Sequence, residues 1–279
     1  MRNLGYAWTV TQKERLSELG AEVADEDFAS AAERDKAFFQ QEKELKKAGR
    51  QRLEAYRQEI RRPGLCQLRE KLASALVAKG FVEVATPTII SRQMLAKMTI
   101  DDEHELFSQV FWLDKNKCLR PMLAPNLYYV SKDLLRLWKE PMRIFEIGSC
   151  FRKESQGSTH LNEFTMLNLV EWGVPMEART AHLAEFAKLV METAGLPDYE
   201  LEQEDSVVYG DTMDVTYHGI EVASSAMGPH PLDGAWGITT TWAGIGFGLE
   251  RLLMLREGGR NVKSYGRSIT YLDGTRLNL

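Results

Sequence analysis

Residues 143–170 limit the possible folds of this chain more than any other stretch. Two apolar runs of strand length, residues 144–151 and 164–170, flank a polar loop rich in Gly and Ser. Such a pattern is typical of a β-hairpin. The loop is longer than a tight hairpin turn, and long loops are more often functional. The stretch therefore predicts two antiparallel strands with a binding site where the loop begins and ends.

Four side chains at the mouth of this hairpin suit a nucleotide. They are Arg152, Glu154, His160 and Phe164. Arginine can fork onto phosphate oxygens, a carboxylate can accept from an exocyclic amine, and a flat ring can stack on a base. An Arg-x-Glu pair in an isolated hairpin is more commonly a surface ion pair. A nucleotide site therefore needs support from the rest of the chain.

Composition indicates a cytoplasmic protein with a substantial core. The chain has 279 residues, of which 44% are hydrophobic, enough for one large domain or a domain with a small appendage. No segment reaches the roughly 18 apolar residues of a membrane span, and the N-terminus lacks the apolar core of a secretory signal. Cys66, Cys118 and Cys150 are scattered, which indicates buried small side chains rather than disulfides or a zinc site.

Charge is segregated near the N-terminus. The net charge of −5 argues against a protein that coats nucleic acid through its overall field. Residues 43–62 nevertheless hold eight basic side chains against three acidic ones, and residues 18–35 hold seven acidic side chains against one arginine. The basic stretch is a candidate contact for a polyanion, and a solvated helical face is an equally good interpretation.

The first 62 residues are predicted to form a helical extension. A capping box at Thr11 begins a first helix that stops at Gly20. A second helix is expected from Asp27 to Gly49, and a third over residues 50–60. Pro63-Gly64 is the clearest boundary in the chain. The sequence therefore predicts two regions, residues 1–62 and 63–279.

The second region is predicted to be an α+β domain. The patterns predict helices over 65–80, 91–98, 175–194 and 249–256 and from 125, and strands over 81–86, 110–113, 118–122, 211–217, 220–227 and 242–248. Short turns join most neighbouring strands, which favours an antiparallel sheet flanked by helices over a doubly wound sheet.

Residues 244–251 form a second candidate ligand surface. Their Gly-x-Gly-x-Gly spacing fits neither a dinucleotide-binding loop nor a P-loop. Alternate glycines leave one face of a strand without side chains, so a flat ligand can lie against the backbone. Arg251, at the start of the next helix, can reach that face. The alternative is a strand that packs tightly on a helix.

Together these features resemble the three signature motifs of class II aminoacyl-tRNA synthetases. The motifs are the helix and strand ending at Pro87, Phe-Arg-x-Glu at 151–154 followed by Phe164, and Gly-x-Gly-x-Gly-x-Glu-Arg ending at Arg251. Within that class the chain resembles the pyrrolysyl-tRNA synthetases, most clearly at residues 120–128, 150–155, 160–169, 208–212 and 244–251. The resemblance covers residues from about 60 to 279, and Asn168 and Tyr209 are its most discriminating positions.

The resemblance implies an ATP site. Arg152 would hold the α-phosphate and the substrate carboxylate, Glu154 the adenine amine, and Phe164 and Arg251 the two faces of the ring. His160 would reach the outer phosphates, and Glu221 with Ser224 would help to hold Mg²⁺, which prefers oxygen ligands. Leu161 and Val222 complete the implied ATP-binding set, and Arg152, Glu221 and Arg251 the catalytic set.

The resemblance also implies an amino-acid pocket and partners. The pocket would be lined by Met122, Ala124, Leu127, Tyr128, Ser131, Val170, Trp242 and Gly244, with Asn168 donating to the side-chain amide carbonyl and Tyr209 closing over the ligand. Ser131 and Ala226 are smaller than is usual in the family, and both would widen the pocket. The expected reaction is ATP-dependent activation of pyrrolysine and its transfer to tRNA(Pyl).

The same resemblance implies a domain organisation and an oligomeric state, and other functions remain as alternatives. The chain resembles the branch that lacks a fused N-terminal tRNA-binding domain, and a homodimer through residues 65–87 is expected. The other candidates are a phenylalanine-type or phosphoserine-type class II synthetase and a non-catalytic nucleotide-binding paralogue. Asn168 and the absence of a basic pocket weigh against phosphoserine.

Overall fold

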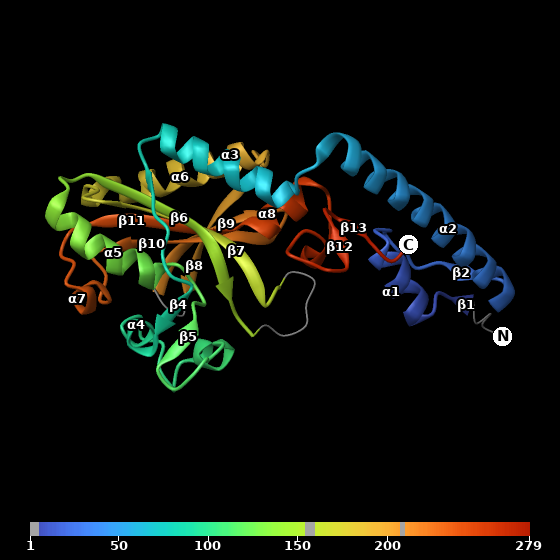
Figure 1. Cartoon of the computed structure of the whole chain (residues 1–279), viewed down its shortest axis with the longest axis horizontal. Coiled ribbons are helices and arrows are strands. Elements are labelled where there is room, and N and C mark those ends of the chain that lie inside the picture. The colour runs from blue at the N-terminus through green and yellow to red at the C-terminus, as the bar shows by residue number, and fades with distance from the viewer. Residues whose placement is uncertain (1–5, 154–159, 207–209) are drawn as a thin grey trace. The chain divides into compact units, whose positions relative to one another are not determined.

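Two units make up the chain. The structure is a computed structural model that describes residues 6–153, 160–206 and 210–279, with only the backbone described within 203–211. Contacts between residues group Met1–Gly64 with Lys263–Leu279, and leave Leu65–Val262 as the second unit. Figure 1 shows the elements of both.

The first unit is built on two helices. These are α1 (Val10–Glu18) and α2 (Ala31–Ala55), which continues into a π-helical turn, Tyr56–Ile60. Short strand pairs complete it: β1 (Tyr6–Ala7) with β2 (Asp27–Phe28), and β12 (Tyr271–Leu272) with β13 (Thr275–Arg276). The caps are Thr9, in a capping box with Gln12, and Ser30, so the predicted starts at Thr11 and Asp27 were wrong.

The predicted break at Gly49 was also wrong. Gly49 is buried inside α2, and a Cβ there would lie 3.0 Å from the side chain of Leu279. This glycine therefore makes room for the C-terminal residue and does not end the helix. The sequence pattern placed residues 263–279 in the larger region, whereas their contacts group them with the helical unit. The packing of Leu279 beside Gly49 joins residues that are far apart in the chain, so no local pattern predicts it.

The second unit is organised around a seven-stranded sheet. Its strand order is β3-β6-β7-β11-β10-β9-β8. The strands are β3 (Val82–Glu83), β6 (Met142–Phe151), β7 (Glu163–Trp172), β8 (Glu200–Ser206), β9 (Gly210–Tyr217), β10 (Ile220–Gly228) and β11 (Trp242–Gly248). Every pair is antiparallel except β3 with β6. The predicted α+β class with an antiparallel sheet is confirmed.

Helices cover both sides of this sheet. Figure 1 shows α3 (Gly64–Ala78) and α6 (Arg179–Ala194) on one side, and α5 (Ala124–Leu137) with α4 (Arg92–Ala96) on the other. Two short helices, α7 (Asp233–Trp236) and α8 (Leu249–Arg256), flank β11 in the sequence. Strand β5 (Lys117–Leu119) pairs with β4 (Ile89–Ser91). The predicted 110–122 hairpin is present in short form, because Trp112 and Cys118 form an antiparallel bridge, Leu113 N donates to Lys117 O and Leu119 N donates to Phe111 O.

The cysteines differ from one another. Cys118 and Cys150 are buried, as expected, whereas Cys66 is exposed, contrary to the prediction. Burial raises the pKa of Cys118 to about 11 and that of Cys150 to about 12, because a thiolate is poorly solvated in the interior. Across the described residues, none of the helices is both long and apolar enough to cross a membrane.

A buried ion pair joins β6 to the segments around it. Arg120 and Glu146 are each 3% exposed, and Arg120 Nη1 lies 2.7 Å from Glu146 Oε1. Arg120 also donates to Ser149 O and Thr86 Oγ1, and Thr86 Oγ1 donates to Glu146. A Cβ on Gly148 would lie 2.1 Å from Arg120 Nη2. The absence of a side chain at Gly148 therefore makes room for the guanidinium.

We expect Gly148→Ala to destabilise this unit. The new methyl group has no space while Arg120 keeps its hydrogen bonds, and overpacking of this kind costs about 1–3 kcal/mol of unfolding free energy. Gly248→Ala is the matched control, because a Cβ there meets nothing within 4 Å and the backbone φ is −90°. Denaturant unfolding should separate the two variants. Equal stability would contradict the close packing at Gly148.

Candidate active site

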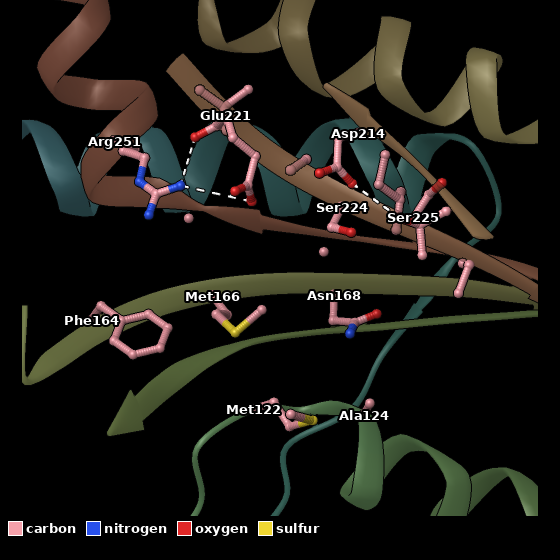
Figure 2. Close-up of a pocket in the computed structure, with 18 of the residues that line it drawn as sticks. Met122, Ala124, Phe164, Met166, Asn168, Asp214, Glu221, Ser224, Ser225 and Arg251 are labelled. Atoms are coloured by element: carbon pink, nitrogen blue, oxygen red, sulfur yellow. Dashed lines mark hydrogen bonds and ion pairs between the residues drawn. The ribbon is translucent and has the colours of Figure 1, made fainter. Parts of the chain in front are cut away.

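A cavity of about 490 Å³ lies in the second unit. Strands β7, β9, β10 and β11, the segment before α5 and the start of α8 all contribute side chains to it. Figure 2 shows Arg251, Glu221 and Ser224 on one side, facing Phe164, Met166 and Asn168 of β7. Met122 and Ala124 approach from the α5 end. The cavity has the size of a small-molecule site.

Every second side chain of strand β7 belongs to one wall of the cavity. Phe164, Met166, Asn168, Val170 and Trp172 all line the cavity. Successive side chains of a strand point to opposite faces, and accordingly Thr165, Leu167 and Leu169 are buried away from it. Three of the five, Phe164, Asn168 and Val170, were predicted from the sequence. Met166 and Trp172 were missed, although the same period of two predicts both.

Strand β11 provides a floor without side chains. Gly244 pairs with Val170 and Gly246 with Asn168 across the sheet. A Cβ on Gly246 would lie 3.3 Å from Met166 Cε and 3.6 Å from Asn168 Nδ2. Side chains here would occupy the space beside Asn168. The predicted bare face of this strand is therefore part of the cavity.

The two predicted arginines line the same cavity. Arg152 Nε donates to Pro121 O at 2.9 Å, and its guanidinium lies 5.4 Å from the ring centroid of Phe164. Arg251 Nη1 donates to Glu221 O at 2.6 Å and lies 3.8 Å from its carboxylate, as dashed in Figure 2. Both guanidinium groups are fixed by backbone oxygens. The cavity therefore contains two oriented cations.

A β-bulge shapes the edge beside Arg251. Glu221 pairs with Thr216 but Ala223 pairs with Val215, so the register shifts between them. Bulges re-aim side chains next to active sites, and here Glu221, Val222 and Ser224 all line the cavity. Glu221 and Ser224 are oxygen donors of the kind that Mg²⁺ prefers. The described residues contain no cluster of three metal-binding side chains, so a metal bound here needs further oxygens from a ligand.

The opposite end of the cavity is apolar and aromatic. Met122, Ala124, Leu127 and Tyr128 line it, together with Val170, Ala226 and Trp242. Ser131 does not line it. Four residues after Leu127, Ser131 lies about 6 Å further along α5, where it is fully buried and its hydroxyl finds no partner among the described residues. The predicted place of Ser131 in the pocket wall is therefore corrected.

His160 and Leu161 also line the cavity. Glu154 and Tyr209 lie outside the described residues. Every other residue that the sequence analysis assigned to a site, apart from Ser131, lies on this one cavity.

Comparison with known proteins identifies the family. A model of the tRNA synthetase class II core domain (F) matches residues 52–272. A crystal structure of pyrrolysyl-tRNA synthetase from Desulfitobacterium hafniense superposes with a TM-score of 0.93, at 56% identity over 98% of both chains. The chain belongs to the pyrrolysyl-tRNA synthetase family of class II synthetases. A second structure from the same organism matches with a TM-score of 0.93, at 54% identity over 100% of this chain and 99% of that one.

More distant relatives share only part of the synthetase. A threonine–tRNA ligase of Mycolicibacterium smegmatis is 30% identical over 116 residues, which are 39% of this chain and 17% of the ligase. The threonine–tRNA ligase of Nitrosomonas europaea is 26% identical over 99 residues, 15% of its length. The chain thus spans less than a fifth of these curated relatives.

Further cavity residues of the synthetase were missed by the sequence analysis. Thr212 and Asp214 lie on β9, where Asp214 is paired with Ser224. Their spacing of two was a usable signal. Glu250 is 1% exposed and accepts from the Thr165 amide through both oxygens, at 2.9 and 2.8 Å. This bond joins the start of α8, and so Arg251, to β7, and only the tertiary structure brings the two segments together.

We expect substitutions at Gly246 to impair amino-acid binding in proportion to their size. Ala contacts the flexible end of Met166 and raises KM little, whereas Val fills the floor beside Asn168 and raises KM for the amino acid by about tenfold or more. Steady-state pyrophosphate exchange measures both variants. Thermal melting is the control, because the added group enters the cavity and not the core. An unchanged KM in Gly246→Val would argue against a ligand on this floor.

Proposed function

We propose that this synthetase activates pyrrolysine with ATP to the aminoacyl-adenylate and then transfers it to the 3′ end of tRNA(Pyl). The observation that carries the proposal is that Arg152 and Arg251 line one and the same cavity. Bare glycines lie between its polar end and its apolar end. The likeness to pyrrolysyl-tRNA synthetase over 98% of the chain supports the choice of substrate.

Arg152 is the centre of the proposed chemistry. Its guanidinium can hold the substrate carboxylate and the α-phosphate together, and it offsets the negative charge that develops as the carboxylate attacks phosphorus. The bond from its Nε to Pro121 O fixes the fork before substrates arrive. No side chain needs to act as a nucleophile, because alignment of the two reactants supplies much of the rate.

The remaining ATP contacts surround Arg152. Phe164 and Arg251 lie on opposite sides of the cavity in Figure 2, so the two can sandwich an adenine ring. Glu154 is assigned to the adenine amine and His160 to the outer phosphates, with Leu161 and Val222 beside the nucleotide. Glu221 and Ser224 would hold Mg²⁺ together with phosphate oxygens, and the ion supplies charge neutralisation at the phosphates when bound.

The amino-acid side chain is assigned to the apolar end. A long acylated lysine suits a deep cleft with few polar groups. Asn168 makes no hydrogen bond with the described part of the chain, and it faces the cavity in Figure 2. Its amide can therefore donate to the carbonyl of the acyl group, while Tyr209 closes over the ligand. Ala226 lines the cavity and leaves extra room for bulky acyl groups.

Two assignments concern partners. We place a homodimer contact at α3 and β3. Val77 of α3 is 55% exposed, and Val82 of the edge strand β3 is 44% exposed. Edge strands with exposed apolar side chains favour pairing with another chain. The basic stretch 43–62 in the helical unit is assigned to tRNA contact, since clustered cations attract a polyanion.

Replacing Arg152 tests the mechanism. We expect Arg152→Ala to lower ATP–pyrophosphate exchange by about 100-fold or more, as removal of one transition-state donor does elsewhere. Arg152→Lys is expected to retain part of the activity, because it keeps the charge and loses the fork. Circular dichroism is the check that both variants fold. Normal exchange by Arg152→Ala would remove this residue from the mechanism.

Replacing Asn168 tests the substrate. We expect Asn168→Ala to lose exchange with pyrrolysine by about tenfold or more, the effect of one lost hydrogen bond in a closed site, and to accept bulkier lysine derivatives. The measurement is kcat/KM for a series of acyl-lysines. A uniform loss across the series would point to a structural role.

The alternatives predict different substrates. A phenylalanine-type or phosphoserine-type synthetase would exchange with those amino acids and not with acyl-lysines, and a non-catalytic paralogue would exchange with none. One exchange assay of the unmodified synthetase across these amino acids separates the three.

A further inference from the structure

Asp233 is a buried carboxylate behind the apolar end of the cavity. It is 4% exposed and does not line the cavity. Its oxygens accept from Tyr128 Oη at 2.8 Å, from Trp242 Nε1 at 3.1 and 3.0 Å, and from the His230 amide at 2.7 Å. Two of these donors belong to rings that line the cavity.

The carboxylate is held by neutral donors. Among the described residues, the donors to the Asp233 oxygens are these neutral groups, and no lysine, arginine or histidine of that part of the chain forms an ion pair with Asp233. A buried charge is tolerated when hydrogen bonds replace its hydration. The Tyr128 hydroxyl and the Trp242 N–H must therefore keep pointing at Asp233.

The two rings have little other freedom. Tyr128 stacks on Trp236 with centroids 5.5 Å apart and planes inclined by 16°, and it meets Trp242 edge-on at 5.9 Å. A Cβ on Gly228, the strand partner of Trp242, would lie 1.9 Å from Trp242 Nε1. Packing sets where the rings lie, and the bonds to Asp233 set how they are turned.

We propose that Asp233 is a positioning residue for substrate selection: it fixes the orientation of Tyr128 and Trp242 and thereby sets the shape of the cavity end that receives the substrate's side chain. The proposal rests on the proposed function, which assigns the apolar end to the amino-acid side chain. It adds that selection among side chains depends on a residue that never touches the substrate.

Asp233→Asn is the informative substitution because it keeps the shape. The amide has one acceptor oxygen, with two lone pairs, and an NH₂ group, so it cannot accept from all three donors. At least one of the three bonds that now hold Tyr128, Trp242 and the His230 amide is lost or reversed. We expect KM for acyl-lysines to rise by about tenfold or more, the effect of one unsatisfied buried donor. The KM for ATP stays within about twofold, and the kcat/KM ratio between a bulky and a small acyl-lysine changes by about fivefold or more.

A double-mutant cycle separates positioning from general stability. Tyr128→Phe with Trp242→Phe removes both donors and leaves an aromatic ring at each position, and this double variant is itself the reference for the second arm of the cycle. In that background Asp233→Asn has no ring to act through, so its effect on the ratio should fall below about twofold. The same change of ratio in both backgrounds would overturn the proposal. If Asp233→Asn does not fold, Tyr128→Phe alone, which keeps the ring and removes one donor, should shift the ratio, and an unchanged ratio would overturn the proposal equally.

Glu171→Gln is the matched control. Glu171 is a buried carboxylate of the same unit, 2% exposed, paired with Arg143 and His182 and outside the cavity lining. It should lower the melting temperature without changing the substrate ratio. The unmodified synthetase is the reference in every arm, so failure of the proposed function shows as its lack of exchange with acyl-lysines. In that case the same ratios are measured between the amino acid that it does activate and a bulkier analogue.

Discussion

The buried ion pair between Arg120 and Glu146 fixes the segments that hold Arg152, the centre of the proposed chemistry. The Arg120 guanidinium joins Glu146 of β6 to Thr86, which follows β3 in the chain. Pro121 is the next residue after Arg120. Pro121 then accepts from Arg152. A buried pair is stable only when its remaining hydrogen bonds are made, and here backbone and hydroxyl oxygens make them. The orientation of the proposed catalytic cation is thus set by the core beneath it.

Neighbouring strands of the sheet contribute different surfaces to the cavity. Strand β7 presents a side chain to the cavity at every second residue, while β11 presents glycines opposite two of them. The same register therefore gives a wall and a floor. The bulge in β10 adds a polar edge at Glu221. Strand pairing by itself thus places a flat, bare surface beside oxygen donors and a cation, which is the combination that a nucleotide requires.

Much of the fold could be predicted because its signals are local. The hairpin of β6 and β7, the turn at His218 and Gly219 and the Gly-rich β11 followed by α8 all lie where periodicity and turn residues put them. The errors share one cause. Gly49 was taken for a helix stop and residues 263–279 for part of the larger region, and in both cases contacts made by the C-terminal segment decided the outcome. Tertiary contacts override local propensity.

The sequence by itself determined the family and the α+β class, and it pointed to residues within motifs, such as Arg152 and Arg251, that line the cavity, because chemistry at fixed spacing is visible in a linear chain. Only the tertiary structure decided that Ser131 lies outside the cavity and that Asp233 stands behind it. Asp233 and Tyr128 are 105 residues apart. No periodicity relates residues at such a separation, since their contact exists only once the sheet and its helices have packed together.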